Sequence, residues 1–361
     1  MNFNNKITLL IVIYNRPTYT LNWIENAIKK KIPFNILIAD AGNNSNLRKK
    51  IKNKIKSVTN CKYLKCKYFP PHSENYFLNF SYATKKIKTK YTYICEDDDF
   101  IVPENIIKSA KFLEKNNEFI VSGGQNINMT LRKNSFLNYS LFNTEQIFRV
   151  KDLNQKDFYS RISKYLDGKF ISHWNCLHRT EKLKKIMVLI DKEKFKNFMV
   201  AELYYNLLIL YFGKTHRFNH VEYVKTNDIT QSSSFTYLEK INFFNIISDL
   251  NFSSENYKIL YFLKKYIYND KLSIIEKKLK KDHSSSYKHW FYYSDYYKSK
   301  EYLIKKTLKN ILVNMKLFHL IKYFQITMKY KKIRYHNFFA VNLFCKNLVN
   351  RNLKLINRNI F

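Results

Sequence analysis

The chain has 361 residues, of which 45% are hydrophobic, and its formal net charge is +36. This length allows two domains, or one large domain with an appendage. Five glycines and five prolines are too few for collagen-like sequence or Pro-rich disorder. The charge predicts attraction to polyanions such as nucleic acid, anionic lipid or phosphorylated substrates, but Lys is abundant throughout, so the charge identifies no particular partner.

The cysteines and the apolar runs indicate in which cellular compartment the protein works. The five cysteines show no Cys-x-x-Cys spacing, which indicates neither a disulfide framework nor a zinc site. The apolar run at residues 7–13 lacks the cleavage site of a signal peptide, and no stretch approaches the ~20 apolar residues of a membrane span. We therefore expect a cytoplasmic protein.

Strand and helix patterns alternate along the first third of the chain. Residues 7–13 are nearly all apolar, as in a strand buried on both faces of a parallel sheet. Residues 34–39 and 61–68 predict two further strands. Apolar residues at helical spacing follow each strand, and these predicted helices cover residues 18–30, 47–58 and 76–87. This alternation predicts a βαβ sheet.

The pattern continues less regularly to about residue 240. We expect strands at 119–122, 171–177 and 217–225, and helices at 106–115, from 182, and at 198–212. Residues 126–165 are polar and suggest no element. After residue 240 long basic amphipathic segments replace the alternation. The sequence therefore predicts one domain over residues 1–240 and a basic helical region over residues 241–361.

An acidic run, Glu96-Asp97-Asp98-Asp99, directly follows the apolar stretch at residues 91–95. Pro103 then begins an amphipathic segment, so the acids lie between a buried strand and a helix, where open α/β sheets bind ligands. Four adjacent carboxylates repel one another, and Mg²⁺ or Mn²⁺ would neutralise them. A solvated acidic turn is the alternative. The flanking strand and the scarcity of acids elsewhere favour the metal.

Residues 5–235 resemble the family-2 glycosyltransferases, enzymes that use nucleotide-sugar donors. Four stretches carry the resemblance: Ile7–Pro17, which ends in Tyr-Asn-Arg-Pro; Ile36–Asn43, which contains Asp40; Glu96–Pro103, similar to the acidic metal motif of the family; and Ala201-Glu202, where the family often has an acidic pair. The resemblance implies the α/β class and a GT-A fold, a Rossmann-like mixed sheet flanked by helices. A mostly α-helical C-terminal extension would follow.

The sequence departs from the family pattern in three places. Glu96 replaces the first Asp of the metal motif, Asp97 is an additional acid, and Ala201 replaces the first acid of the pair. The register of the motif is therefore open, with Asp98 in the usual ligand position. The Gln-x-x-Arg-Trp motif of processive synthases is absent, which argues against a polymerising membrane synthase.

The resemblance assigns roles residue by residue. The metal ligands would be Asp98 with Asp99 or Asp97, and Glu202 would be the general base of an inverting reaction. The nucleotide-sugar would bind at six residues: Tyr14, Asn15, Arg16, Asp40, Glu96 and Asp97. Simpler roles compete, because Glu202 suits the first turn of any helix and Asp40 suits a turn. His216 or His220 could add a metal ligand, although an ordinary partly buried histidine fits each better.

These features predict a metal-dependent glycosyltransferase. It would move a sugar from a nucleotide-diphosphate donor to a hydroxyl of a growing surface glycan, such as lipopolysaccharide or capsule, or of a lipid-linked acceptor. One alternative is a nucleotidyltransferase, but such enzymes usually have a Gly-rich basic loop after the first strand, unlike Tyr14–Pro17. Another is a non-enzymatic nucleic-acid-binding protein, which would not need the acids Glu96–Asp99.

The C-terminal stretch, residues 302–361, interleaves Lys and Arg with apolar residues and contains no Asp or Glu. A basic amphipathic helix can lie on an anionic membrane, here the inner face of the plasma membrane. The stretch could equally pack on the catalytic domain. Nucleic acid is a less favoured third partner.

Overall fold

We analysed a computed structural model of the chain. It describes residues 3–56, 58–66, 73–133, 140–148, 152–167, 172–195, 198–227 and 250–279. The chain forms two compact units, Met1–Leu272 and Ser273–Phe361, and the first contains the elements described below. The predicted boundary near residue 240 and the basic stretch 302–361 lie outside the described residues.

Nine strands of the described chain form one mixed sheet, with the order β3-β2-β1-β4-β8-β6-β9-β5 and β7 paired to β6. The strands are β1 (Ile7–Ile13), β2 (Asn35–Asp40), β3 (Cys61–Lys65), β4 (Tyr91–Cys95), β5 (Phe100–Ile101), β6 (Phe119–Lys133), β7 (Ser140–Phe148), β8 (Leu177–Arg179) and β9 (Lys214–Asn227). Strands β1 to β4 are parallel to their neighbours in this group, and β8 is antiparallel to β4 and β6. The predicted α/β class with a mixed sheet is confirmed.

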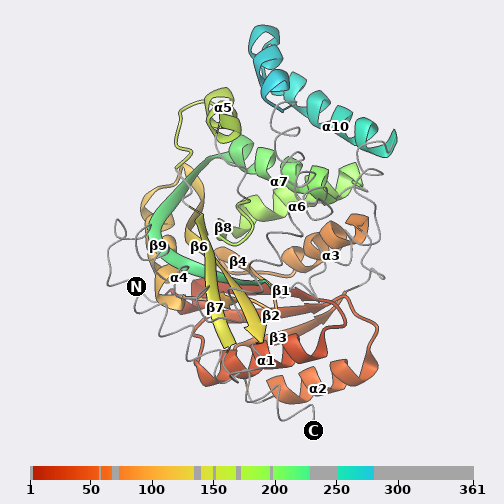
Figure 1. Ribbon diagram of the computed structural model, residues 1–361, viewed down its shortest axis with the longest axis vertical. Coiled ribbons are helices and arrows are strands. Elements are labelled where there is room, and N and C mark those ends of the chain that lie inside the picture. The colour runs from red at the N-terminus through yellow and green to blue at the C-terminus, as the bar shows by residue number, and fades with distance from the viewer. Residues whose placement is uncertain are drawn as a thin grey trace, which may run out of the picture. The chain divides into compact units, whose positions relative to one another are not determined.

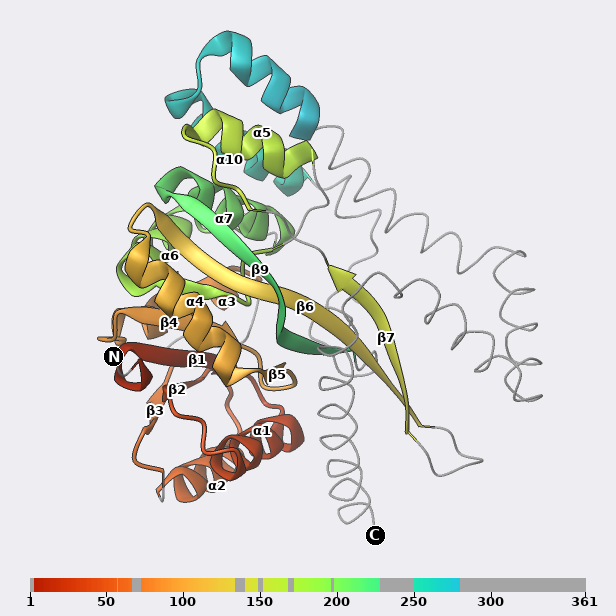
Figure 2. The same ribbon diagram turned by 90° about the vertical axis from the view of Figure 1, so that its left-hand side faces the viewer.

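Helices cover both faces of the sheet. They are α1 (Pro17–Lys29), α2 (Ser45–Ile55), α3 (Ser73–Lys85), α4 (Pro103–Lys115), α5 (Phe158–Asp167), α6 (Thr180–Glu193), α7 (Phe198–Phe212) and α10 (Leu250–Tyr266), after a short 3-10 turn, η1 (Asn4–Lys6). Helices α1 and α2 lie on one side of β1–β3, and α3, α6 and α7 lie on the other (Figures 1 and 2). No helix among the described residues has the length and apolarity needed to cross a membrane.

The core explains the continuous apolar run of β1. Ile7, Leu9 and Ile11 pack with Trp23 of α1 and Ile51 of α2 in one cluster. The alternate residue Leu10 is also fully buried, because helices cover the second face too. A strand between two helical layers has no solvent side, so it needs no polar alternation. Burying such side chains contributes about 1.5–3 kcal/mol each.

The middle of the chain differs from the sequence-based expectation. Strand β6 extends past Gly123-Gly124 to Lys133, and residues 126–165 contain β7 and most of α5. A Cβ atom at Gly124 would lie 2.5 Å from the carbonyl oxygen of His220 and 2.6 Å from the Cβ of Glu222. The glycine therefore marks a close approach of strand β9 rather than a strand end.

The strand predicted at residues 171–177 is wrong in its bounds. Strand β8 begins only at Leu177, and its pairing with β4 covers just Leu177 to Arg179. The preceding residues form a loop, in which Trp174 N–H donates to the Ser172 hydroxyl over 3.3 Å. The apolar character of this stretch reflects side-chain burial in the loop: Trp174 and Cys176 are both buried.

Candidate active site

Polar loops gather where the parallel strands β1, β2 and β4 end. The strand register pairs Ile13 of β1 with Asp40 of β2, and Ile11 with Cys95 of β4. The loops that follow are residues 14–16, 41–44 and 96–99. Because the carboxyl ends of parallel strands meet at one edge, these loops form the ligand-binding edge expected of an open α/β sheet.

Strands on either side hold the acidic loop Glu96–Asp99 in place. It begins after β4 and ends at β5, whose Phe100 pairs with Val224 of β9. This pairing brings the neighbours of Val224 to the acids. The Tyr223 hydroxyl donates a hydrogen bond to Asp99 Oδ2, and Asp99 is 1% exposed.

Three of the four acids converge. One carboxylate oxygen from each of Glu96, Asp98 and Asp99 lies within 4.8 Å of the other two. Asp97 turns to the start of helix α1, where its carboxylate accepts from Nη1 of Arg16, the residue before the helix, at 3.1 Å and from the Thr20 hydroxyl at 2.7 Å. The structure therefore groups Asp98 and Asp99, both expected as ligands, with Glu96, and it places Asp97 outside the group. Three carboxylates suit a hard divalent cation.

Two cations of the chain itself already reach this loop. Arg16 Nη2 lies 2.6 Å from Asp98 Oδ2. Lys225 of β9 interacts electrostatically with the acids, and Glu96 contributes most to raising the lysine pKa above its usual value. The repulsion among the acids is thus partly compensated inside the protein. No local pattern indicated Lys225, because only the pairing of β5 with β9 brings it here.

Burial is the largest cause of the pKa shifts of the carboxyl groups in this loop. It raises the pKa of Asp97 to about 6, although the neighbouring Arg16 opposes the shift. Burial also raises the pKa of Glu96 and of Asp99, with Lys225 opposing in both cases. A low-dielectric site disfavours the charged carboxylates, so the arrangement favours binding of additional positive charge.

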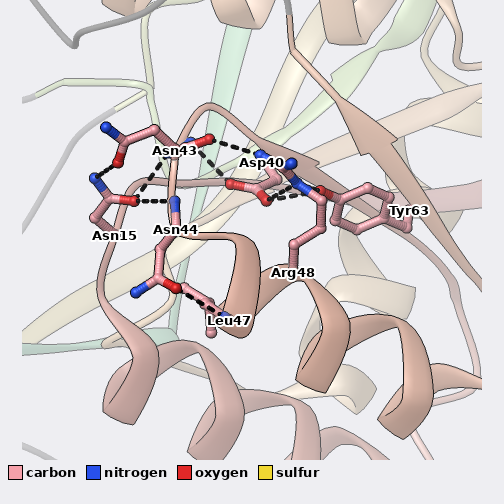
Figure 3. A network of polar contacts seen from close by, with 8 residues as sticks. Asn15, Asp40, Asn43, Asn44, Leu47, Arg48 and Tyr63 are labelled. Carbon is pink, nitrogen blue, oxygen red and sulfur yellow. Dashed lines mark hydrogen bonds and ion pairs between the residues drawn. The ribbon is translucent and has the colours of Figure 1, made fainter.

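The turn after β1 contacts the loop after β2 (Figure 3). Asn15 has a φ of 45°, a left-handed conformation in which Asn is enriched. Its Oδ1 accepts from the backbone N–H groups of Asn43, at 3.0 Å, and Asn44, at 3.1 Å. Tyr14 and Arg16 flank it, half-buried. Residues 14–16 therefore join the second loop through Asn15 and the acidic loop through Arg16.

Asp40 is engaged by groups of the protein (Figure 3). Its carboxylate accepts from Gly42 N–H at 2.8 Å and from the Tyr63 hydroxyl at 2.7 Å, and Arg48 Nε lies 3.7 Å away. A Cβ atom at Gly42 would come within 2.5 Å of Asn15 Oδ1, so the loop needs glycine there. These contacts fix the loop, and a contact of Asp40 with a nucleoside stays a prediction.

Glu202 lies in the first part of helix α7, close to the acidic loop. Burial raises the pKa of Glu202, whereas a hydrogen bond from Ser172 and the charge of Lys225 lower it. Glu96 also interacts with it electrostatically, which places these two carboxylates near each other despite their separation in sequence. His216 instead pairs with Asp152 over 2.9 Å, and His220 Nε2 lies 3.9 Å from Glu222; neither histidine belongs to the three-carboxylate group.

Comparisons with known proteins were made for the sequence and for the fold. The sequence profile of glycosyl transferase family 2 matches residues 8–193. No curated protein sequence matches the chain. Solved structures of TarS from S. aureus are similar at low identity. For TarS 1–349 the identity is 14%, with 80% of this chain and 74% of that chain covered and a TM-score of 0.49.

Two further TarS structures align less well. The same TarS fragment in complex with UDP-GlcNAc has 14% identity, coverage of 72% of this chain and 71% of that chain, and a TM-score of 0.37. A longer TarS structure has 16% identity, coverage of 72% and 43%, and a TM-score of 0.36. The family assignment rests on the sequence profile, which spans just over half of the 361 residues. The chain belongs to glycosyl transferase family 2, and it is a glycosyltransferase with a GT-A-like fold.

Proposed function

We propose that the chain transfers a sugar from a nucleoside diphosphate sugar to a hydroxyl of an acceptor, with Mg²⁺ or Mn²⁺ bound at Glu96, Asp98 and Asp99. One observation carries the proposal. A half-buried carboxylate, Glu202, lies beside three converging acids at the carboxyl ends of parallel strands. Sugar transfer needs a cation site for the diphosphate and a base for the acceptor in this proximity.

The donor would bind along the three loops. A divalent cation at the three acids would stabilise the negative charge that develops on the departing diphosphate. Arg16 and Lys225 are the cations that interact with these acids among the described residues, and they would support the same diphosphate. Tyr14, Asn15 and Asp40 lie in or beside the adjoining loops, and we assign the nucleoside to them. Asp97 holds Arg16 and so acts on the donor through that residue.

Glu202 would act as the general base. Its carboxylate accepts the proton of the acceptor hydroxyl as the oxygen attacks the anomeric carbon, and the nucleoside diphosphate leaves. The Ser172 hydrogen bond fixes the orientation of the carboxylate. With the base and the diphosphate site on opposite sides of the sugar, the reaction inverts the anomeric centre. Such a base typically contributes 10²–10⁴-fold to the rate.

The acceptor would be a growing surface glycan or a lipid-linked intermediate at the inner face of the plasma membrane. The cation-rich stretch 302–361 supports this location, because it contains no Asp or Glu to offset its Lys and Arg residues. Basic segments near an anionic leaflet gain about 1 kcal/mol for each Lys or Arg. Such tethering would bring a cytoplasmic enzyme to its acceptor.

A donor screen tests the proposed function. Purified full-length chain is incubated with UDP-, GDP- and dTDP-sugars in Mn²⁺, Mg²⁺ or EDTA, and release of the nucleoside diphosphate is measured. We expect slow hydrolysis of one donor class with Mn²⁺ or Mg²⁺ and little in EDTA. Pyrophosphate release from a nucleoside triphosphate and a sugar phosphate would instead indicate a nucleotidyltransferase. Equal hydrolysis in EDTA would contradict the metal requirement.

A further inference from the structure

An aromatic cluster adjoins the candidate base. Tyr76 of helix α3 stacks on Trp174, with ring centroids 5.8 Å apart and an interplanar angle of 29°. Trp174 also meets the ring of Tyr205 edge to face at 5.0 Å. Tyr205 follows Glu202 by three positions on α7, so the two side chains are neighbours on the helix surface. The cluster thus runs from α3 to the helix that carries the base.

The loop before β8 connects the cluster to the carboxylate. The backbone N–H of Trp174 donates to Ser172 Oγ over 3.3 Å, and the Ser172 side chain hydrogen-bonds Glu202. The Trp174 side chain is 6% exposed. Its indole N–H has no hydrogen-bond acceptor among the described residues.

Tyr76 interacts with both halves of the candidate active site. Burial raises the pKa of its phenol well above the usual value, and the charges of Glu96, Glu202 and Asp98 add to this shift. The phenol therefore keeps its proton and can donate a hydrogen bond.

The position of the transferred sugar follows from the two groups on either side of it, the leaving phosphate and the attacking hydroxyl. In the proposed reaction the anomeric carbon lies between the departing phosphate oxygen, at Glu96 and Asp98, and the attacking oxygen, at Glu202. Tyr76 stacks on Trp174, and the adjoining Ser172 hydrogen-bonds Glu202, so the Tyr76 ring lies on the side of this space that carries the base. Aromatic faces suit this role, because they offer a rigid apolar surface and, in tyrosine, a polar tip.

We infer that Tyr76 contacts the pyranose ring of the transferred sugar, with Trp174 supporting its ring. This inference rests on the proposed function and names the part of the substrate that the aromatic cluster recognises. Tyr76 then distinguishes a nucleotide sugar from the nucleoside diphosphate alone. A contact that holds the donor sugar in place also fixes the position of its anomeric carbon relative to Glu202.

The test compares two affinities in the full-length chain with Mn²⁺. Calorimetry measures binding of the donor chosen by the screen and of its nucleoside diphosphate, in wild type, Tyr76→Phe and Tyr76→Leu. We expect Tyr76→Leu to weaken donor binding about tenfold, the combined effect of a lost aromatic contact and a lost hydrogen bond. Binding of the nucleoside diphosphate should stay within about twofold. Tyr76→Phe keeps the stack and should give an intermediate loss.

Tyr82→Leu is the matched control, since Tyr82 lies on the same helix α3, half-buried, beside Lys86. It should leave both affinities unchanged, and a circular dichroism melt confirms that all variants fold. Equal loss for donor and nucleoside diphosphate in Tyr76→Leu would overturn the inference and assign the residue to the nucleotide. Unchanged donor affinity in a folded Tyr76→Leu would overturn it as well. If wild type hydrolyses no donor in the screen, the proposed function itself fails.

Discussion

Arg16 Nη2 lies 2.6 Å from Asp98 Oδ2, and Nη1 of the same guanidinium lies 3.1 Å from Asp97 Oδ1. One side chain therefore joins the turn after β1 to the acidic loop after β4. The forked geometry of Arg suits two carboxylates at once. Any cation that binds Asp98 shares this carboxylate with Arg16, so the guanidinium affects both the stability of the loop and its affinity for metal.

Replacement of Arg16 should destabilise the fold in a pH-dependent manner. In Arg16→Met the buried Asp97 loses its partner, and breaking such a pair costs about 3–5 kcal/mol. The pKa of Asp97 is raised to about 6, so its destabilising charge is present above that pH and disappears as the pH falls and the carboxyl is protonated. Urea unfolding at pH 5 and pH 8 should therefore show the larger deficit at pH 8.

Arg179→Met is the control for this pH dependence. Arg179 donates to backbone carbonyls, among them that of Phe119 at 2.8 Å, and it has no carboxylate partner in those bonds. Its loss should destabilise equally at both pH values. An Arg16→Met deficit that is also independent of pH would show that Asp97 does not depend on Arg16 for its charge.

The metal role of Asp98 is tested with an isosteric change. Asp98→Asn keeps the shape but removes the charge, and we expect Mn²⁺-dependent affinity for a nucleoside diphosphate to fall by more than about tenfold, since even outer-shell losses cost 10–100-fold. Asp157→Asn makes the same change at an exposed carboxylate that accepts from Ser160 N–H at 2.9 Å, and calorimetry should find it unaffected. Normal affinity in Asp98→Asn would remove Asp98 from the metal site.

Glu202→Gln tests the general base. The amide cannot take the acceptor proton, so kcat should fall about 10²–10⁴-fold while nucleoside diphosphate affinity changes little. Glu181→Gln, at a side chain that is 81% exposed in the first turn of α6, controls for the substitution. Steady-state kinetics with near-normal kcat in Glu202→Gln would assign the base to another residue.

The pH profile should reflect the environment of Glu202. The pKa of Glu202 is raised from 4.5 by burial, and a base works only when ionised, so kcat should fall on the acid side with an apparent pKa above 4.5. Lys225 lowers this pKa. In Lys225→Met the acid limb should therefore move to higher pH, whereas Lys225→Arg keeps the charge and should leave it nearly in place. Movement to lower pH in Lys225→Met would contradict the assignment.

The basic stretch 302–361 yields a prediction from the sequence. Full-length chain should co-sediment with anionic phosphatidylglycerol vesicles at low salt and dissociate as salt rises, because the attraction is screened. Neutral phosphatidylcholine vesicles should not bind. RNA at the same charge concentration is the control for general polyanion binding. If anionic vesicles fail to retain the chain at low salt, the membrane location is wrong.

Local sequence patterns predicted much of the fold, because short-range physics determines those parts. The apolar run of β1 and the helical stripe of α7 appear in the structure where they were expected. The acidic loop was placed correctly after the strand β4, but the short strand β5 lies between the loop and helix α4. The strand predicted at 119–122 ended too early, since the close approach of β9 at Gly124 depends on a strand from a distant part of the chain.

The candidate site was harder to predict, since its chemistry comes from pairings between distant segments. No local pattern shows that Asp97 binds Thr20 and Arg16, or that Tyr63 donates to Asp40. Lys225 reaches the acids only because β9 pairs with β5. The spacing of acids predicted a metal site, but it could not say which carboxylates converge.

A crystal structure of the full-length chain with Mn²⁺ and a nucleoside diphosphate tests the proposed site most directly. We expect an anomalous Mn²⁺ peak in direct contact with Asp98 and with Glu96 or Asp99. The diphosphate should lie on the same ion, near Arg16 and Lys225. An ion bound elsewhere, or a nucleotide bound away from the ends of β1, β2 and β4, would contradict it.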